Sequence, residues 1–438
     1  MLNRKIQNVI KEYFTSNSNK ILIIDGARQI GKSFIIRHEG QIQFPNYIEV
    51  NLLEDKMGER IFANVTSTVD FYMRLSSVAG DKMGDKYDTL VFIDEIQAYP
   101  ELLTLLKFLK DEDRFTYIVS GSLLGIALNQ TLSKPGGRIR VERMYPLDFE
   151  EFLWANHIGE EVIAFMREQF VQRQSLNEAL HNKFLSLFKQ YLFIGGLPDA
   201  VNIFVETQNV RRVRETHDEI LNLYKEDAAQ YSLEHSLKIK RIYELIPSYM
   251  ENKKKRVYFN KIEGKKGGRS SNYEEEFEYL VRSGIAIDVL AISNPVFPLI
   301  ESAQKNLLKL YLNDVGLLSQ LLFQHNISAV LDDHNSINLG SLYETAVASE
   351  LLAHQHKLYY YDNKQKGVVD FLIDDYDTLS IMPLEVKSGK DYTIHRALDK
   401  FIANQNYHIV NAMVLSNERV VRTENAITYI PIYYVMFL

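Results

Sequence analysis

Four short apolar runs mark the N-terminal third of the chain, each bounded by polar or turn-forming residues. They are Lys20–Asp25, Tyr47–Leu53, Thr89–Gln97 and Arg114–Ser122. Runs of this length predict strands buried on both faces, as in a parallel sheet. Phe34–Arg37 opens a helix soon after the first run. We therefore expect residues 1–150 to form an α/β domain in which helices sandwich a parallel sheet.

The middle of the chain changes to helical spacing. Residues 151–235 are expected to be helical, most clearly over Glu178–Phe193, with a turn at Gly195–Pro198. Between 236 and 310 the pattern predicts helices and short strands in alternation, at Ile242–Ile246, Arg256–Phe259, Asn272–Val281 (capped by Ser271) and Ile285–Ile292. Helices followed by a strand pair indicate a winged-helix-like module.

Residues 311–438 predict a small α/β domain. The expected elements are one helix and three strands, at Leu339–His354, Leu358–Tyr361, Gly367–Ile373 and Met382–Ser388.

Composition narrows the class of protein. The chain has 438 residues, 46% hydrophobic and 24% charged, which is ordinary for globular domains. It has no cysteine, which excludes disulfides, thiolate zinc sites and cysteine nucleophiles. Because we find no signal peptide and no run of about 18 apolar residues, we expect a cytoplasmic protein. The net charge of −7 means that any nucleic-acid contact must come from a local patch.

Gly26–Ser33 matches the phosphate-binding motif G-x-x-x-x-G-K-[ST], between a predicted strand and a predicted helix. Gly26 and Gly31 allow the backbone to curl so that N–H groups face phosphates, and the helix N-terminus adds a favourable dipole. Lys32 is expected to reach the β- and γ-phosphates of ATP, and Ser33 to bind Mg²⁺. The whole cradle comprises Gly26, Ala27, Arg28, Gln29, Ile30, Gly31, Lys32, Ser33 and Phe34.

Two acids end the third apolar run. Asp94 is expected to hold Mg²⁺, and Glu95 to orient and deprotonate the attacking water. The fourth run ends in Ser120 and Ser122, which either sense the γ-phosphate or cap the strand. An acid pair together with an extra polar-tipped strand indicates the additional-strand, catalytic-glutamate class of P-loop ATPases.

An arginine-rich segment follows at Gly136–Arg143. Arg138, Arg140 or Arg143 is a candidate for transition-state charge, in the same chain or toward a neighbouring subunit, and we favour Arg138 among them. The alternative is a surface salt bridge.

A basic stretch runs from Lys253 to Arg269, interleaved with Tyr258 and Phe259. Its members are Lys253, Lys254, Lys255, Arg256, Lys261, Lys265, Lys266 and Arg269. It is the one local patch able to neutralise several DNA phosphates. A solvated loop, or pairing with the acidic run Glu274–Glu278, explains it equally well.

Four motifs together resemble a family of prokaryotic AAA-type ATPases. They are Gly26–Ser33, Phe92–Gln97, Tyr145–Phe152 and Gly195–Pro198. The resemblance covers essentially the whole chain. It implies that 151–235 form a helical lid and that a C-terminal domain of unknown function has a restriction-endonuclease-like core.

That resemblance makes four polar residues near the C-terminus candidate site residues. They are Glu344, Asp370, Glu385 and Lys387. Glu385 and Lys387 are two apart, so they share one face of a strand. A helix followed by three strands resembles the PD-(D/E)XK nuclease core. There Asp370 and Glu385 would hold Mg²⁺, Lys387 would position water, and Glu344 would orient a further water. The alternative is a charged sheet with an internal Lys–Glu pair.

Three hypotheses follow. The protein is an ATPase whose nucleotide state controls DNA binding or cleavage, an ATP-gated switch or scaffold without nuclease activity, or a ring-forming remodeller.

Overall fold

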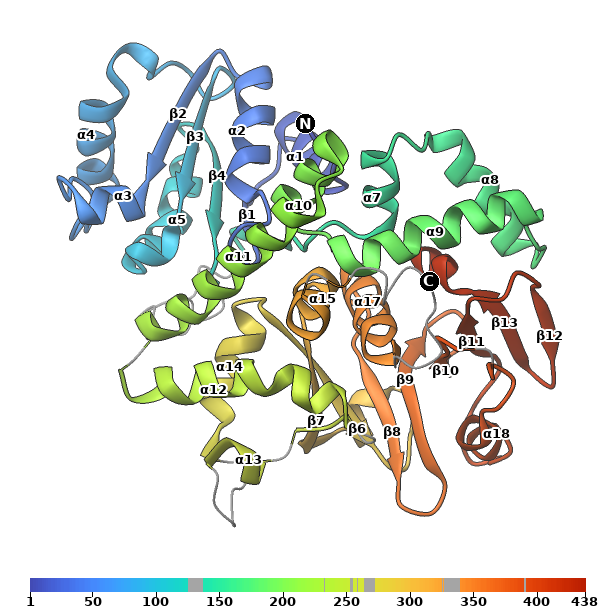
Figure 1. The fold of residues 1–438 in the computed structure, drawn as a ribbon. Coiled ribbons are helices and arrows are strands. Elements are labelled where there is room, and N and C mark those ends of the chain that lie inside the picture. The colour runs from blue at the N-terminus through green and yellow to red at the C-terminus, as the bar shows by residue number, and fades with distance from the viewer. Residues whose placement is uncertain are drawn as a thin grey trace. The chain divides into compact units, whose positions relative to one another are not determined.

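A computed structural model of the chain describes residues 1–124, 137–231, 233–252, 255–257, 259–263, 272–324, 326, 339–389 and 391–438. They divide into two compact units. The N-terminal unit consists mainly of residues 3–145, and the C-terminal unit mainly of residues 146–281 and 285–438. Figure 1 shows both as ribbons.

The N-terminal unit contains a five-stranded sheet. Its strands are β1 (Ile21–Asp25), β2 (Asn46–Asn51), β3 (Thr89–Asp94), β4 (Thr116–Gly121) and β5 (Ile139–Arg143). They lie in the order β2-β3-β4-β1-β5, and every neighbouring pair is parallel. The parallel sheet expected from the apolar runs is confirmed, and β4 is the extra strand between β1 and β3. The second run is shorter than predicted, because the Asn51 side chain accepts hydrogen bonds from two backbone N–H groups and caps a helix at Leu52.

Helices cover both faces of this sheet (Figure 1). They are α1 (Ile6–Thr15), α2 (Lys32–Gln43), α3 (Leu52–Met57), α4 (Thr68–Ala79) and α5 (Glu101–Glu112), with 3₁₀ turns η1 (Gly80–Lys82) and η2 (Ile96–Ala98). Leu75 of α4 and Leu106 of α5 share a buried core with Ile23 and Ile93. Strand side chains alternate in direction, so the other face packs on α2, where Gly40 lies against Leu90.

The C-terminal unit begins with helices, as expected. They are α7 (Phe149–Ala155), α8 (Glu160–Val171), α9 (Glu178–Ile194), α10 (Pro198–Thr207) and α11 (Val210–Tyr231). The predicted turn at Gly195–Pro198 separates α9 from α10. Further along are α12 (Leu233–Met250), α13 (Phe259–Glu263), α14 (Glu274–Arg282), α15 (Val315–Phe323), α17 (Gly340–Ala353) and α18 (Arg396–Ile402), with η4 (Leu299–Ser302) and η5 (Ile432–Phe437).

An eight-stranded mixed sheet forms the centre of the C-terminal unit. Its strands are β6 (Ala286–Ile292), β7 (Gln304–Leu312), β8 (Tyr359–Asn363), β9 (Gly367–Asp375), β10 (Ser380–Val386), β11 (Ala412–Ser416), β12 (Arg422–Glu424) and β13 (Ile427–Pro431). Their order is β12-β13-β11-β10-β9-β8-β6-β7. A buried core that includes Leu398 and Phe401 of α18 packs against it.

The region expected to be a winged-helix-like module differs from that expectation. β6 and β7 pair antiparallel, but β6 also pairs in parallel with β8. The pair therefore extends the C-terminal sheet, and no break in the sheet falls at residue 310. β6 is mostly apolar, with one face buried and the other partly buried at Asp288 and Leu290, which suits a strand inside a sheet better than a wing.

Among the described residues of Arg256–Phe259, where a short strand was predicted, no strand is present. Val257 N–H donates one hydrogen bond to the Leu308 carbonyl, and Phe259 already begins α13. The cap predicted at Ser271 lies outside the described residues.

Within the described residues, no helix is both long and apolar enough to cross a membrane.

Candidate functional site

The loop between β1 and α2 has the backbone that a phosphate cradle needs. Gly26 and Gly31 have φ angles of 150° and 89°, a region that side chains disfavour. A Cβ atom on Gly26 would also collide with the Met144 carbonyl. Both glycines of the motif are therefore required by geometry, and α2 begins directly after them at Lys32.

Lys32 is buried inside this loop. Its Nζ donates hydrogen bonds to the carbonyl oxygens of Gly26 and Ala27, at 2.9 and 2.7 Å. Burial lowers the pKa of Lys32 overall. The nearby carboxylates of Glu95, Asp25 and Asp94 offset only part of that effect. A cation held by neutral carbonyls at a helix N-terminus is a ready partner for phosphate oxygens.

Asp94 ends β3 at the same edge of the sheet. Its Oδ1 accepts a hydrogen bond from Ser120 Oγ at the end of β4 and another from Glu95 N–H at 3.0 Å. The serine predicted as a sensor thus contacts the acid predicted to hold Mg²⁺. Ser33 lies half-buried in the first turn of α2, and Phe34 beside it is exposed.

Glu95 is held by Gln97, a residue to which the sequence pattern assigned no role. Gln97 Nε2 donates hydrogen bonds to Glu95 Oε2 and, at 3.1 Å, to Ser122 Oγ. Glu95 itself has a φ of 56°, which is unusual for a residue with a side chain. Ser122 therefore acts on Glu95 through Gln97, rather than directly.

The C-terminal unit brings the four nuclease-spaced residues into one charged cluster. Asp370 Oδ2 accepts a hydrogen bond from Val386 N–H at 2.9 Å, and Lys387 Nζ donates to Glu385 Oε1 at 2.9 Å. Burial, together with the charges of Glu344 and Glu385, raises the pKa of Asp370 to about 8. Burial is also the main cause that raises the pKa of Glu385.

Glu344 has partners that the sequence did not indicate. Lys255 Nζ and Tyr311 Oη donate to its two carboxylate oxygens, and Lys309 Nζ lies 3.6 Å away. Burial raises the pKa of Glu344, but Lys255 and Lys309 outweigh it and lower the pKa overall. The carboxylate is thus compensated by amines inside the protein.

The basic stretch is described only in part. Lys255 contacts Glu344, Arg256 lies 3.4 Å from Asp362, and Lys261 lies over the ring of Tyr249. These three side chains have partners within the chain. Lys253, Lys254, Tyr258, Lys265, Lys266 and Arg269 lie outside the described residues.

Three family models match the chain. An AAA domain matches residues 18–153, and two domains of unknown function match residues 185–328 and 339–435. Residues 18–153 are thus similar to an AAA domain and are called the AAA domain below. The family model that matches residues 185–328 spans both domain boundaries expected from the sequence, at residues 235 and 310.

Two solved structures with low sequence identity were also found. The Walker-type ATPase PABY2304 of Pyrococcus abyssi is 15% identical, with a TM-score of 0.45, over 73% of this chain and 96% of that chain. The S. cerevisiae Hsp104–ADP complex is 11% identical, with a TM-score of 0.28, over 81% of this chain and 44% of that chain. No curated protein matched the sequence.

Within the AAA domain, the structure does not bring Arg138 to the P-loop. The Arg138 carbonyl accepts a hydrogen bond from Ile21 N–H at the start of β1. The Arg138 guanidinium lies 2.7 Å from the Asp111 carboxylate. The P-loop leaves from the other end of β1, four residues and about 13 Å further along. Arg143 is the arginine opposite Asp25 at that end. Arg140 lies between them and pairs with Glu142 at 2.8 Å.

A second residue of the N-terminal unit, Arg4, was not identified from the sequence. Arg4 is buried, and its guanidinium donates to the carbonyls of Ile30 and Tyr145, at 3.0 and 2.7 Å. Ile30 belongs to the P-loop, so the hydrogen bond from Arg4 helps to hold the loop backbone in place. No pattern links positions so far apart in the sequence, and the contact is visible only in the fold.

Proposed function

We propose that the protein is a Mg²⁺-dependent ATPase. The observation that carries this proposal is that Lys32, Asp94 and Glu95 interact at one edge of a parallel sheet. Lys32 follows β1, the two acids follow or end β3, and β4 lies between these two strands. A phosphate-binding cation, a metal-binding acid and a base near one another are the parts that ATP hydrolysis requires. The AAA-domain match over 18–153 supports the same reading.

Each part has a proposed role. The backbone of residues 26–34 binds the phosphates of ATP, and the Lys32 ammonium compensates their charge. Ser33 and Asp94 would hold Mg²⁺, which supplies charge neutralisation on the phosphates when bound. Glu95 takes the proton of the attacking water, Gln97 orients Glu95, and Ser120 orients Asp94. Arg143, rather than Arg138, is the arginine we assign to the P-loop end of the sheet.

We further propose that nucleotide state controls the C-terminal unit, through nucleic-acid binding or a nuclease-like reaction. Asp370 and Glu385 are oxygen donors suited to Mg²⁺, and Lys387 beside Glu385 would position a water. Asp370 lies on β9 and Glu385 on the antiparallel strand β10, which Lys387 directly follows. The PD-(D/E)XK-like assignment of this domain belongs to the same proposal.

A switch or interaction scaffold without nuclease activity is the second candidate. The observation that favours it is the compensation of Glu344 by Lys255, Lys309 and Tyr311, which suits a stable charged network. A ring-forming remodeller is the third, and it predicts ATP-dependent oligomers.

One set of samples tests these candidates. The purified chain is assayed for ATP hydrolysis with Mg²⁺, alone and with DNA or RNA, and the nucleic acids are then examined for cleavage. We expect ATP hydrolysis that Mg²⁺ removal abolishes. Absence of both binding and hydrolysis would overturn the main proposal. Cleavage that disappears in Asp370→Ala identifies the nuclease form, whereas intact nucleic acid favours the switch. Oligomer size measured with and without ATP tests the ring.

A further inference from the structure

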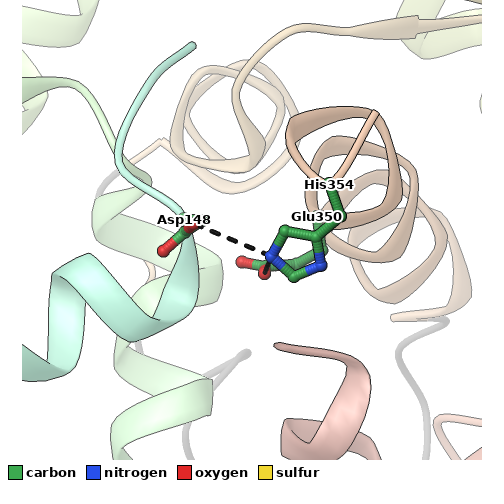
Figure 2. Close-up of side chains that lie close together, drawn as sticks. All are labelled: Asp148, Glu350 and His354. Atoms are coloured by element: carbon green, nitrogen blue, oxygen red, sulfur yellow. Dashed lines mark ion pairs between the residues drawn. The ribbon is translucent and has the colours of Figure 1, made fainter. Parts of the chain in front are cut away.

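Three side chains of types that can ligate a metal meet in the C-terminal unit, and none of them belongs to the charged groups described above. Asp148 directly precedes α7, Glu350 lies in the last turn of α17, and His354 directly follows that helix (Figure 2). Glu350 and His354 are four residues apart, so their side chains lie on the same side of the helix end. One ligand atom from each of the three residues lies within 4.8 Å of the other two. Among the described residues, this is the one group of three or more with that property.

The two carboxylates are held in place by the first turn of α7. Asp148 Oδ1 accepts from Glu151 N–H at 2.9 Å, in a capping box. Glu350 Oε1 accepts from Phe149 N–H. The second oxygens, Asp148 Oδ2 and Glu350 Oε2, lie 3.8 and 3.9 Å from His354 Nε2. Each acid therefore has one oxygen bound to backbone and one turned toward the imidazole.

The imidazole is oriented from its other side. His354 Nδ1 lies 2.8 Å from a main-chain oxygen of Leu438, the last residue of the sequence. This oxygen accepts the hydrogen bond, so Nδ1 carries the proton and Nε2 faces the carboxylates of Asp148 and Glu350. A histidine that ligates a metal usually donates its other ring N–H to a carboxylate or a backbone oxygen, because that hydrogen bond fixes the ring and its tautomer.

The spacing suits a small cation. Ligands at about 2.0–2.1 Å in a tetrahedral zinc site lie about 3.3 Å from one another. The observed 3.8 and 3.9 Å would need to close by about half an ångström. Imidazole with carboxylates suits zinc and its first-row neighbours, whereas Mg²⁺ and Ca²⁺ prefer oxygen alone. Asp148 and Glu350 are buried and His354 is partly exposed, which leaves a water side for a fourth ligand.

The geometry points to a divalent transition-metal site, with zinc as its ion, held by Asp148 Oδ2, Glu350 Oε2 and His354 Nε2. The site is separate from the ATP-bound Mg²⁺ and does not depend on the proposed ATPase activity. The ion ties the start of α7 to the last turn of α17, two elements about 200 residues apart in the sequence. Its role is therefore to stabilise the C-terminal unit. The competing arrangement of the same atoms is a plain ion pair between a protonated His354 and the two acids.

The test is zinc binding to the untagged full chain, without nucleotide. Calorimetry with Zn²⁺ gives stoichiometry and affinity, and Co²⁺ absorption reports the coordination geometry. The chain has no cysteine, so a thiolate cannot produce the cobalt signal. We expect one Zn²⁺ per chain, a tetrahedral Co²⁺ spectrum, and a Tm that rises with zinc. In His354→Gln the affinity should fall by about tenfold or more, and the spectrum and the Tm rise should be lost.

Conservative variants separate ligand loss from misfolding. Asp148→Asn keeps a helix-capping oxygen, and Glu350→Gln keeps an acceptor for Phe149 N–H, but each loses a charged ligand. Both should weaken zinc while folding normally. His408→Gln, at an exposed position, is the matched control and should bind as the wild type does. No stoichiometric zinc in the wild type, or equal binding in His354→Gln, would overturn the metal site and leave the ion pair.

Discussion

The side-chain amide of Gln97 joins Glu95 to Ser122. One nitrogen, Nε2, donates to the carboxylate of the first and the hydroxyl of the second, and Oε1 lies 3.4 Å from Ser122 N. Gly121 comes close enough to Gln97 that an added Cβ would lie 2.9 Å from Oε1. The proposed catalytic base is thus positioned by a glutamine packed against the end of β4.

Replacing Gln97 by leucine should reduce the rate of ATP hydrolysis without weakening ATP binding. A hydrogen bond to a charged group contributes about 1.5–3 kcal/mol, so we expect kcat to fall by about ten- to a hundredfold. Steady-state kinetics should show an unchanged KM, and thermal unfolding an unchanged Tm in the presence of ATP. Gln41→Leu, at an exposed position of α2, is the control. A rise in KM with constant kcat would assign Gln97 to binding instead.

Lys32→Ala should abolish ATP binding at working concentrations. The ammonium lies in the loop that we expect to surround the phosphates, and removing one partner of a buried charge pair costs about 2–5 kcal/mol. Titration with a fluorescent ATP analogue measures this. Lys20→Ala, at an exposed position just before β1, should bind normally. Equal affinity in the two variants would place the nucleotide elsewhere.

Glu95→Gln should keep ATP bound but stall its hydrolysis. The amide has the shape of the carboxylate but cannot accept the water proton, and general base catalysis contributes about 10²–10⁴-fold. Single-turnover hydrolysis and nucleotide retention on the same sample check both halves. Turnover at the wild-type rate would remove Glu95 from the role of base.

Asp370 should make the C-terminal unit less stable at alkaline pH. Burial, Glu344 and Glu385 raise its pKa to about 8, so the folded state binds this proton more tightly than the unfolded chain, where the pKa is about 4. The contribution is complete below the unfolded pKa and is lost as pH rises through the folded one. Unfolding midpoints between pH 5 and 9 in metal-free buffer should therefore fall more steeply in the wild type than in Asp370→Asn. Asp377→Asn, at an exposed position, should follow the wild type, and identical slopes in all three would refute the shift.

The central strands of the parallel sheet, β1, β3 and β4, were predictable because they are buried on both faces. Such strands are continuous apolar runs. The polar residues that end them lie at the edge of the sheet where we place the candidate catalytic residues. Gly26, Lys32, Asp94 and Ser120 were found in this way. The roles of Gln97 and Arg4 were not, because they depend on contacts with Ser122 and with Ile30, which lie about 25 residues away in the sequence.

The arginines show a different limit. Arg138 and Arg143 are five residues apart and look equivalent in the sequence. Only the register of β5 against β1 shows that Arg143, not Arg138, lies at the P-loop end. Registers between parallel strands depend on packing over the whole sheet, and a local pattern does not contain them.

In the C-terminal unit the helix and three strands carrying Glu344, Asp370 and Glu385 were predicted, whereas the neighbours of those acids were not. Lys309 is 1% exposed, and nothing in its sequence context distinguishes it from a surface lysine. The strand Ile285–Ile292, which was expected to belong to a wing, illustrates the same point. One of its two partner strands, β8, lies about 70 residues later in the sequence.

The parallel pairing of β6 with β8 decides where this chain can be cut. A fragment that starts at residue 339 would lack β6 and β7, and β8 would become an edge with open backbone groups along Tyr359–Tyr361. Those tyrosines are buried in the full chain, so the new edge would be aromatic and prone to join other copies. A fragment that starts after Tyr145 keeps all eight strands together. It is the piece to purify when nucleic-acid binding is to be studied apart from ATP.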